Sequence, residues 1–192
     1  YGCGGGGLNA IQACRISGAK QIIAVDTLSQ KLNAAKKFGA THTFNAKDVE
    51  NVPRAVRKLT GGGVDYGFEV IGYPETYRAT YDCVKKGGMC CLVGVAAGRT
   101  EVKIPTSLVF EEKTLTGSFY GSCRPSLDMP TYIEMYLKGD LLLDELVSKY
   151  YTIDDAYSAF NDLASGTNLR GVFMMHDLVN KVSSQGNSGA NL

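Results

Sequence analysis

Tyr1-Gly2-Cys3-Gly4-Gly5-Gly6-Gly7 opens the chain, and its glycines match the pattern G-x-G-x-x-G at Gly2, Gly4 and Gly7. In such a loop the first glycine permits a tight turn and the second lets the backbone approach a pyrophosphate. The third lets a helix pack against a strand. Apolar residues at helical spacing predict a helix over residues 5–17, whose N-terminal amides would face the phosphates. The stretch therefore predicts a dinucleotide-binding loop.

A short apolar run over residues 21–26 ends in Asp26, 26 − 7 = 19 residues after the last glycine of the pattern. A carboxylate about 20 residues beyond the loop is expected to accept hydrogen bonds from a ribose diol. Its charge would repel a 2′-phosphate, so we expect NAD rather than NADP. Lys31 could pair with a phosphate or reach a ribose hydroxyl. The alternative explanation is a flexible glycine-rich end followed by an ordinary strand.

Strands and helices alternate regularly through about residue 95. The expected helices cover residues 5–17, 29–38, 48–59 and 74–84, and the expected strands cover 21–26, 41–44, 64–70, 88–95 and 113–119. This rhythm predicts an α/β fold with a doubly wound parallel sheet of Rossmann type. Ligands bind such sheets at the carboxyl ends of the strands, where Gly2, Asp26, Ile71 and Val95 would meet.

The rhythm changes after about residue 121. An amphipathic helix is expected over residues 129–138, a helix over 156–164 after a cap at 152–155, and a last strand over 170–175. We predict a dinucleotide-binding domain over residues 1–120, a segment over 121–178 that returns to another domain, and a disordered Ser-, Asn- and Gly-rich tail over 179–192.

Composition excludes several classes of function. Twenty Lys and Arg residues balance 19 Asp and Glu residues, so nothing indicates a nucleic-acid or membrane surface. The six cysteines form no C-x-x-C motif and only two histidines are present, so we predict no metal site within the chain. Free thiols in apolar segments suggest a reducing compartment, and we expect a cytoplasmic protein.

The glycine loop of this fold should follow a central strand of the sheet, of which Tyr1 alone is present. A sheet without that strand would leave ladder groups and both faces poorly covered. We therefore expect the chain to be a truncated part of a longer protein.

The chain resembles the C-terminal part of the zinc-dependent, medium-chain alcohol dehydrogenases, nearest the glutathione-dependent formaldehyde dehydrogenase and aryl-alcohol dehydrogenase branches. The resemblance covers roughly residues 1–175. It is carried by Gly2 to Gln12, by Ile23-Ala24-Val25-Asp26 with Lys31, by Phe38-Gly39-Ala40-Thr41, by Gly63-Val64-Asp65-Tyr66, by Phe68-Glu69-Val70-Ile71-Gly72 and by Gly121-Ser122.

The resemblance implies a role for each expected site residue. The glycines would hold the pyrophosphate, and Asp26 and Lys31 the adenosine ribose. Val70 and Ile71 would line the adenine side, and Val93, Gly94 and Val95 would lie along the nicotinamide. The backbone at Phe119 and Tyr120 would meet the carboxamide, and Arg170 would pair with the pyrophosphate. At Gly6 the family usually has valine, so Gly6 would loosen the loop or weaken binding.

The enzymes of this family are oxidoreductases. They transfer a hydride from a primary or aromatic alcohol to NAD, with zinc as the Lewis acid. The resemblance places the catalytic zinc, the structural zinc and the proton relay in a GroES-like catalytic domain outside this chain. No catalytic residue is therefore expected here, and we expect the chain alone to be inactive. The longer protein would bind a small alcohol or aldehyde and form a homo-oligomer.

Two other functions fit part of the pattern. A nucleotide-sensing Rossmann module would bind NAD without chemistry and would not need Tyr120 or Arg170. A methyltransferase that uses adenosylmethionine also has a glycine loop and a ribose acid. Its cofactor lacks a pyrophosphate, however, so Arg170 would have little use there.

Overall fold

The computed structural model describes residues 1–175, which fall into two compact units, Tyr1–Leu141 and the residues from Leu142 onward. Each unit is described by itself. The predicted division after residue 120 concerns the domains of a longer protein and stays a prediction. The predicted tail over residues 179–192 lies outside the described residues, as does His176.

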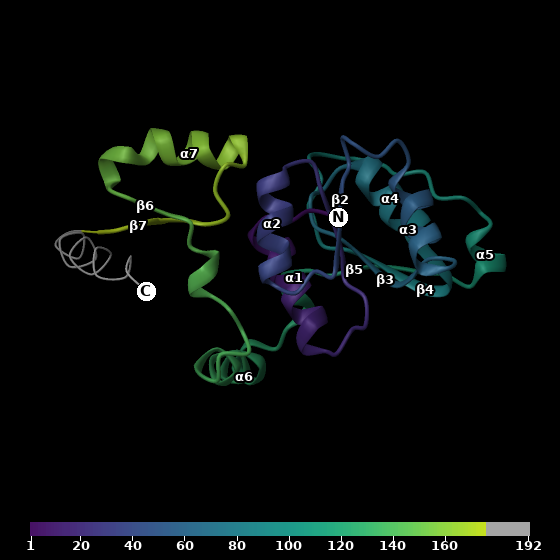
Figure 1. The fold of residues 1–192 in the computed structure, drawn as a ribbon, viewed down its shortest axis with the longest axis horizontal. Coiled ribbons are helices and arrows are strands. Elements are labelled where there is room, and N and C mark those ends of the chain that lie inside the picture. Colours follow the sequence, from purple (N-terminus) through teal and green to yellow (C-terminus); the bar gives the residue numbers. More distant parts are fainter. Residues whose placement is uncertain (176–192) are drawn as a thin grey trace. The chain divides into compact units, whose positions relative to one another are not determined.

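The first unit alternates helices and strands as the sequence predicts (Figure 1). Its elements are α1 (Gly5–Ile16), β1 (Ile23–Asp26), α2 (Ser29–Lys37), β2 (His42–Asn45), α3 (Val52–Thr60), β3 (Val64–Glu69), α4 (Pro74–Cys83), β4 (Val84–Leu92), α5 (Leu108–Glu111), β5 (Thr114–Gly117), the 3₁₀ turn η1 (Tyr120–Ser122) and α6 (Pro125–Leu137).

All strand pairs of the first unit are parallel. One ladder joins β1 to β2, and a second has the order β3-β4-β5. Tyr1 and Gly2 lie between the two ladders. The nitrogen of Tyr1 donates to the carbonyl of Phe68 at 2.7 Å, and the carbonyl of Tyr1 accepts from Val70 N–H at 2.9 Å. Gly2 N–H donates to the carbonyl of Val25 at 2.9 Å. The resulting order, β2-β1-Tyr1-β3-β4-β5, is that of a Rossmann-type sheet.

Helix ends follow local capping chemistry. The side chain of Asn51 accepts from Arg54 N–H at 2.9 Å at the start of α3, and Pro53 fits the first turn. Gly61 ends the same helix with φ +71°, a left-handed conformation that glycine adopts without steric cost.

Two apolar clusters make up much of the core of the sheet. The first contains Val25, Val52, Val56 and Cys83, with Tyr1 packed against it. The second contains Tyr81, Val84 and Cys90. The first cluster joins β1 to α3 and α4, so these two helices cover one face of the sheet, where they lie side by side in Figure 1.

Three elements begin four residues away from their predicted starts. α3 begins at Val52 rather than at residue 48, because Asn51 caps the helix there. β4 begins at Val84, directly after α4, because Val84 is fully buried in the second cluster and no loop intervenes. α6 begins at Pro125 rather than near residue 129. There the carboxylate of Asp128 accepts from Arg124 N–H at 2.6 Å, and Pro125 stands in the first turn, where its missing N–H is harmless.

The second unit contains η2 (Asp144–Leu146), β6 (Lys149–Tyr151), η3 (Ile153–Asp155), α7 (Ala156–Ser165) and β7 (Gly171–Phe173). Thr152 and Asp155 form the expected capping box, in which the side chain of Asp155 accepts from Thr152 N–H at 3.0 Å. β6 and β7 pair in parallel, and β6 was not predicted.

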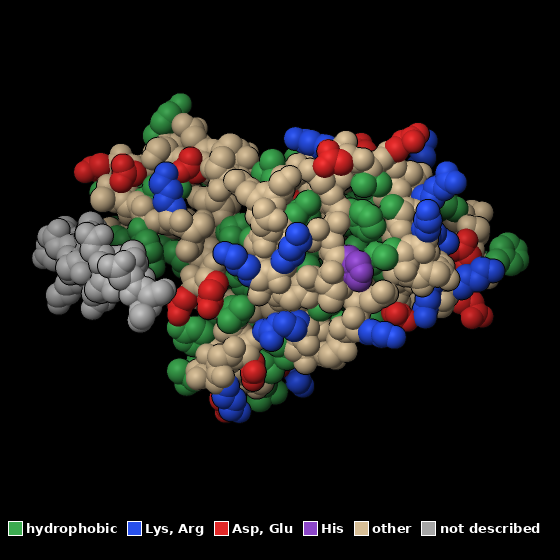
Figure 2. Space-filling model, in the orientation of Figure 1, with side chains coloured by type: hydrophobic (Ala, Val, Ile, Leu, Met, Phe, Trp, Pro, Cys, Tyr) green, Lys and Arg blue, Asp and Glu red, His purple; other side chains and the backbone are tan. Residues whose placement is uncertain are grey.

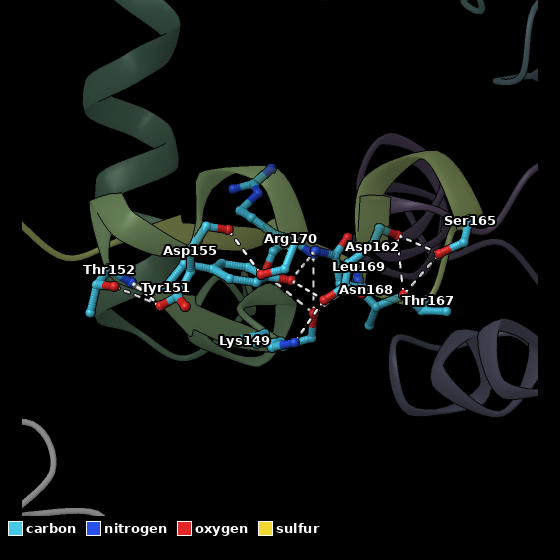
Figure 3. Close-up of polar contacts among 12 residues, drawn as sticks. Lys149, Tyr151, Thr152, Asp155, Asp162, Ser165, Thr167, Asn168, Leu169 and Arg170 are labelled. Carbon is cyan, nitrogen blue, oxygen red and sulfur yellow. Dashed lines mark hydrogen bonds and ion pairs between the residues drawn. The ribbon is translucent and has the colours of Figure 1, made fainter. Parts of the chain in front are cut away.

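Polar contacts around Tyr151 link β6 to α7 and to the segment before β7 in the second unit (Figure 3). The hydroxyl of Tyr151 donates to the carboxylate of Asp162 at 2.7 Å and accepts from the amide of Asn168 at 3.0 Å. Lys149 donates to the same carboxylate at 2.7 Å, and its ammonium lies over the Tyr151 ring.

Lys and Arg side chains are interspersed with Asp and Glu on the face shown in Figure 2, in line with the near-zero net charge. None of the helices within residues 1–175 is long and apolar enough to cross a membrane.

Candidate dinucleotide-binding site

The glycine loop crosses between the carboxyl ends of β1 and β3. Gly2 has φ +93°, and a Cβ there would lie 2.7 Å from the side chain of Ile71. A Cβ on Gly7 would lie 1.8 Å from the carbonyl oxygen of Gly2, so α1 can pack this close only because residue 7 has no side chain. The first and last glycines of the pattern therefore have the structural roles that the sequence predicts.

The N-terminus of α1 is open. Gly4 is the N-cap and has no side chain to accept a hydrogen bond, and Gly5, Gly6 and Gly7 form the first turn. A Cβ on Gly4 would meet nothing within 4 Å. The first N–H groups of a helix lack partners within the helix, and the helix dipole favours an anion there. Open space beside these amides fits a phosphate group.

Asp26 is the last residue of β1, and its carboxylate is fixed by three backbone amides. One oxygen accepts from Cys3 N–H at 2.8 Å. The other accepts from the N–H groups of Thr27 and Leu28 at 2.7 and 3.0 Å. A carboxylate has about four acceptor positions, so one remains for a ligand hydroxyl. The bond to Cys3 also ties the acid directly to the glycine loop, a link that the sequence pattern did not reveal.

The segment after β3 forms one wall beside the loop. Val70 lies against the loop, since a Cβ on Gly6 would be 3.1 Å from its side chain. The smaller residue at position 6 thus makes room for Val70. Ile71, next to it, is partly exposed.

Glu69 is the site residue that sequence reasoning missed. Its side chain is fully buried, and it accepts from Ile71 N–H at 3.1 Å, from Gly72 N–H at 2.9 Å and from the hydroxyl of Thr76 at 2.6 Å. These bonds fix the turn that presents Val70 and Ile71. The sequence did contain a signal for this turn, because Glu69 stands at the end of a strand and is followed by Gly72 and then Pro74.

The segment after β4 packs on the same turn. A Cβ on Gly94 would lie 2.6 Å from the carbonyl carbon of Ile71, and the carbonyl of Glu69 accepts from the N–H groups of Val93 and Gly94. Val95 is 84% exposed. The structure therefore brings the residues predicted after β3 and β4 together.

The remaining predicted residues lie in several places. Phe119 and Tyr120 follow β5 at the carboxyl edge of the sheet, and Phe119 is 88% exposed. Lys31 lies in the first turn of α2. Arg170 belongs to the second unit, where Ser148 N–H donates to its carbonyl at 3.0 Å and the guanidinium extends away from the drawn contacts (Figure 3).

The thiols near the site are held neutral. Burial, followed by the charge of Asp26, raises the pKa of the Cys3 thiol to about 11. Burial likewise raises the pKa of Cys83 to about 11 and that of Cys90 to about 12. Neutral thiols are weak nucleophiles and weak metal ligands, so these cysteines serve packing. Within residues 1–175, no three His, Cys, Asp or Glu side chains gather as a metal site.

A parallel doubly wound sheet with a glycine loop, an open helix N-terminus and a strand-end acid at one edge defines a nucleotide-binding α/β protein. Comparison with known proteins narrows this class. The family described as "Zinc-binding dehydrogenase" matches residues 5–138. The chain belongs to this family.

Known relatives show how much of such a protein is present. Alcohol dehydrogenase 1 of Pisum sativum is 34% identical over 179 residues, which cover 92% of this chain and 47% of the plant protein. Benzyl alcohol dehydrogenase of Acinetobacter calcoaceticus superposes with a TM-score of 0.85 at 32% identity, over 89% of this chain and 47% of that one. A zinc-binding dehydrogenase of Sinorhizobium meliloti, solved with NADP, superposes with a TM-score of 0.71 at 26% identity, over 81% and 45% of the two chains. The chain thus spans about half the length of these relatives.

Proposed function

We propose that this chain is the NAD-binding part of an alcohol dehydrogenase. The observation that carries the proposal is Asp26, whose carboxylate closes β1, holds the glycine loop through Cys3 N–H and keeps one acceptor position for a ribose hydroxyl. The open N-terminus of α1, directly beside it, suits the pyrophosphate.

The other residues have distinct roles in this proposal. Val70 and Ile71 line the adenine side, and Val93, Gly94 and Val95 lie along the nicotinamide. The backbone at Phe119 and Tyr120 meets the carboxamide, Lys31 reaches the ribose and Arg170 pairs with the pyrophosphate. The exposed apolar side chains of Val95 and Phe119 support the placement of a flat ring at this edge. A bound nicotinamide would supply the hydride acceptor.

NAD is favoured over NADP by the charge of Asp26. Three amides already fix this carboxylate, so it cannot swing away from an added 2′-phosphate without breaking those bonds. The Sinorhizobium meliloti relative solved with NADP makes the choice of cofactor a direct test.

In the longer enzyme, the substrate would be a primary or aromatic alcohol, oxidised to the aldehyde. Zinc would be held by a GroES-like catalytic domain, on which the segment over residues 121–178 packs, and the subunits would form a homo-oligomer. These assignments follow from family membership, and the benzyl alcohol dehydrogenase among the relatives supports the aromatic branch.

Calorimetric titration with NAD, NADP and ADP-ribose tests the proposal, with adenosylhomocysteine as a competitor. We expect saturable binding of NAD and ADP-ribose, weaker binding of NADP and no competition. Asp26→Asn should lower the affinity for NAD about tenfold, because it removes about one charge-assisted hydrogen bond to the ribose. It should also reduce the ratio of the affinity for NAD to that for NADP. Displacement by adenosylhomocysteine but not by ADP-ribose would refute the proposal.

Gly4→Ala is the matched variant for the loop. Its Cβ enters open space in the folded chain, so folding should be retained while the methyl group blocks the approach of the pyrophosphate. Unchanged affinity for ADP-ribose in folded Gly4→Ala would place the phosphates elsewhere.

A further inference from the structure

Tyr77 links α4 to the segment that follows β4. Its hydroxyl donates to the carbonyl oxygen of Gly94 at 2.6 Å, at the short end of the range for bonds between a hydroxyl and an oxygen acceptor. The residue is half-buried and stands in the first turn of α4, which begins at Pro74. The bond therefore ties the start of this helix to the carboxyl edge of the sheet.

The backbone at Gly94 is packed too closely for any side chain. A Cβ there would clash with the nitrogen of Gly72 and would lie 2.6 Å from the carbonyl carbon of Ile71. Position 94 must therefore be glycine, the residue whose φ and ψ are least restricted. Its N–H donates to the carbonyl of Glu69 at 2.9 Å, which fixes the peptide before it. The peptide after Gly94 needs a restraint of its own.

The bond from Tyr77 supplies that restraint. A trans peptide group is planar, so its carbonyl and its N–H point in opposite directions. With the oxygen of Gly94 turned toward α4, the N–H of Val95 points away from that helix. Val95 is exposed, so its own side chain contributes little packing to hold this orientation.

We propose that Tyr77 is a positioning residue for the nicotinamide end of the dinucleotide. This role rests on the proposed function, in which Val93, Gly94 and Val95 lie along the nicotinamide. Tyr77 acts through Gly94: its hydroxyl holds the following peptide in the orientation that receives the ring. This part of the site is therefore formed before the cofactor binds.

The neighbouring residue Thr76 supports the other half of the site. Its hydroxyl donates to the carboxylate of Glu69 at 2.6 Å, and that carboxylate accepts from Ile71 N–H at 3.1 Å. Ile71 lines the adenine side in the proposed function. The first turn of α4 thus sends one hydroxyl toward the adenine side and the next toward the nicotinamide side, so the two should affect different parts of the cofactor.

Calorimetric titration of the 192-residue chain with NAD and with ADP-ribose, which lacks the nicotinamide, tests this role. Tyr77→Phe keeps the ring and removes only the hydroxyl. We expect the affinity for NAD to fall about fivefold, the factor that corresponds to about 1 kcal/mol or one hydrogen bond. The affinity for ADP-ribose should stay within about twofold, because a ligand that binds both orientations of the peptide equally does not sense the change.

Two variants serve as controls. Tyr73→Phe removes an exposed hydroxyl at the start of the same helix and should leave both affinities unchanged. Thr76→Val should lower the affinities for NAD and ADP-ribose by the same factor, since both ligands contain the adenine. A change in the ratio of the two affinities is therefore expected for Tyr77→Phe alone.

NMR spectra of the chain without ligand check the structural step. In Tyr77→Phe the resonances of the Gly94 carbonyl carbon and the Val95 amide should move. Unmoved resonances would show that the hydroxyl does not set this peptide.

The titrations separate failure of this role from failure of the proposed function. If Tyr77→Phe lowers both affinities equally, or leaves their ratio unchanged, Tyr77 does not position the nicotinamide site, and the proposed function stands. A parent chain that binds neither ligand would overturn the proposed function and this role with it.

Discussion

Gly7→Ala is expected to unfold the glycine loop even without a ligand. The added Cβ would lie 1.8 Å from the carbonyl oxygen and 2.6 Å from the carbonyl carbon of Gly2. Both are backbone atoms, and Gly2 is held by its bond to Val25 and by φ +93°. No rotamer change can relieve this clash, so the loop and α1 must separate.

The magnitude follows from two opposing effects. Overpacking of this severity costs about 3 kcal/mol, and alanine in place of glycine within a helix returns about 1 kcal/mol. We expect a net loss of about 2 kcal/mol in the free energy of unfolding. Urea denaturation followed by circular dichroism measures it, and ADP-ribose binding should be lost in parallel.

Gly4→Ala is the control, because it makes the same substitution three residues earlier, where a Cβ meets nothing within 4 Å and φ is −75°. Its stability should stay within about 0.5 kcal/mol of the parent chain. If Gly7→Ala is as stable as Gly4→Ala, the close approach of α1 to Gly2 is not what makes glycine necessary at position 7.

Three further predictions concern other parts of the chain. Glu69→Ala should lower the free energy of unfolding, measured by urea denaturation, by about 3 kcal/mol, because the buried Gly72 amide, the partly buried Ile71 amide and the Thr76 hydroxyl lose an acceptor. The same change at the exposed Glu75 should alter it little. Tyr151→Phe should lose about 1–2 kcal/mol through its bonds to Asp162 and Asn168; a loss as small as that of the exposed Tyr150→Phe would contradict this. Burial lowers the pKa of the Tyr1 α-amino group from its ordinary value of 8.0. Between the lowered pKa and 8.0 the folded chain binds fewer protons than the unfolded chain, so stability should rise with pH through that window and level off above about 8. Acetylation of this nitrogen should remove that slope in unfolding free energy, and a slope that persists would assign it to other groups.

Local features of the sequence predicted much of the first unit. The helices at Gly5–Ile16, Ser29–Lys37 and Pro74–Cys83 lie close to their predicted ranges. The apolar spacing of these helices, the glycines Gly18 and Gly39 after the first two, and Pro74 at the start of the third all lie within about a dozen residues, so no distant contact is needed to recognise them. The parallel order of the sheet followed from the alternation of elements, and the structural relatives confirm the Rossmann-type fold.

The candidate site was predicted as a set of residues, but its connections were not. The pattern indicated Asp26 and the loop separately, and only the folded chain joins them through Cys3 N–H. Glu69 was not among the predicted site residues, whereas the structure buries it as the acceptor that fixes the Ile71 turn. Whether each predicted residue touches NAD stays a prediction for the titrations.

Sequence alone thus determined the class of fold, the loop and the strand-end acid, because helix periodicity, caps and glycine turns depend on near neighbours. The tertiary structure alone decided that Tyr1 lies between Val25 and Phe68, that Lys149–Tyr151 forms a strand, and that a cavity separates β1 from β3. These features depend on backbone groups that meet across about 20 to 70 residues of chain. Such pairing is set by the topology of the whole sheet, and no short stretch of sequence encodes it.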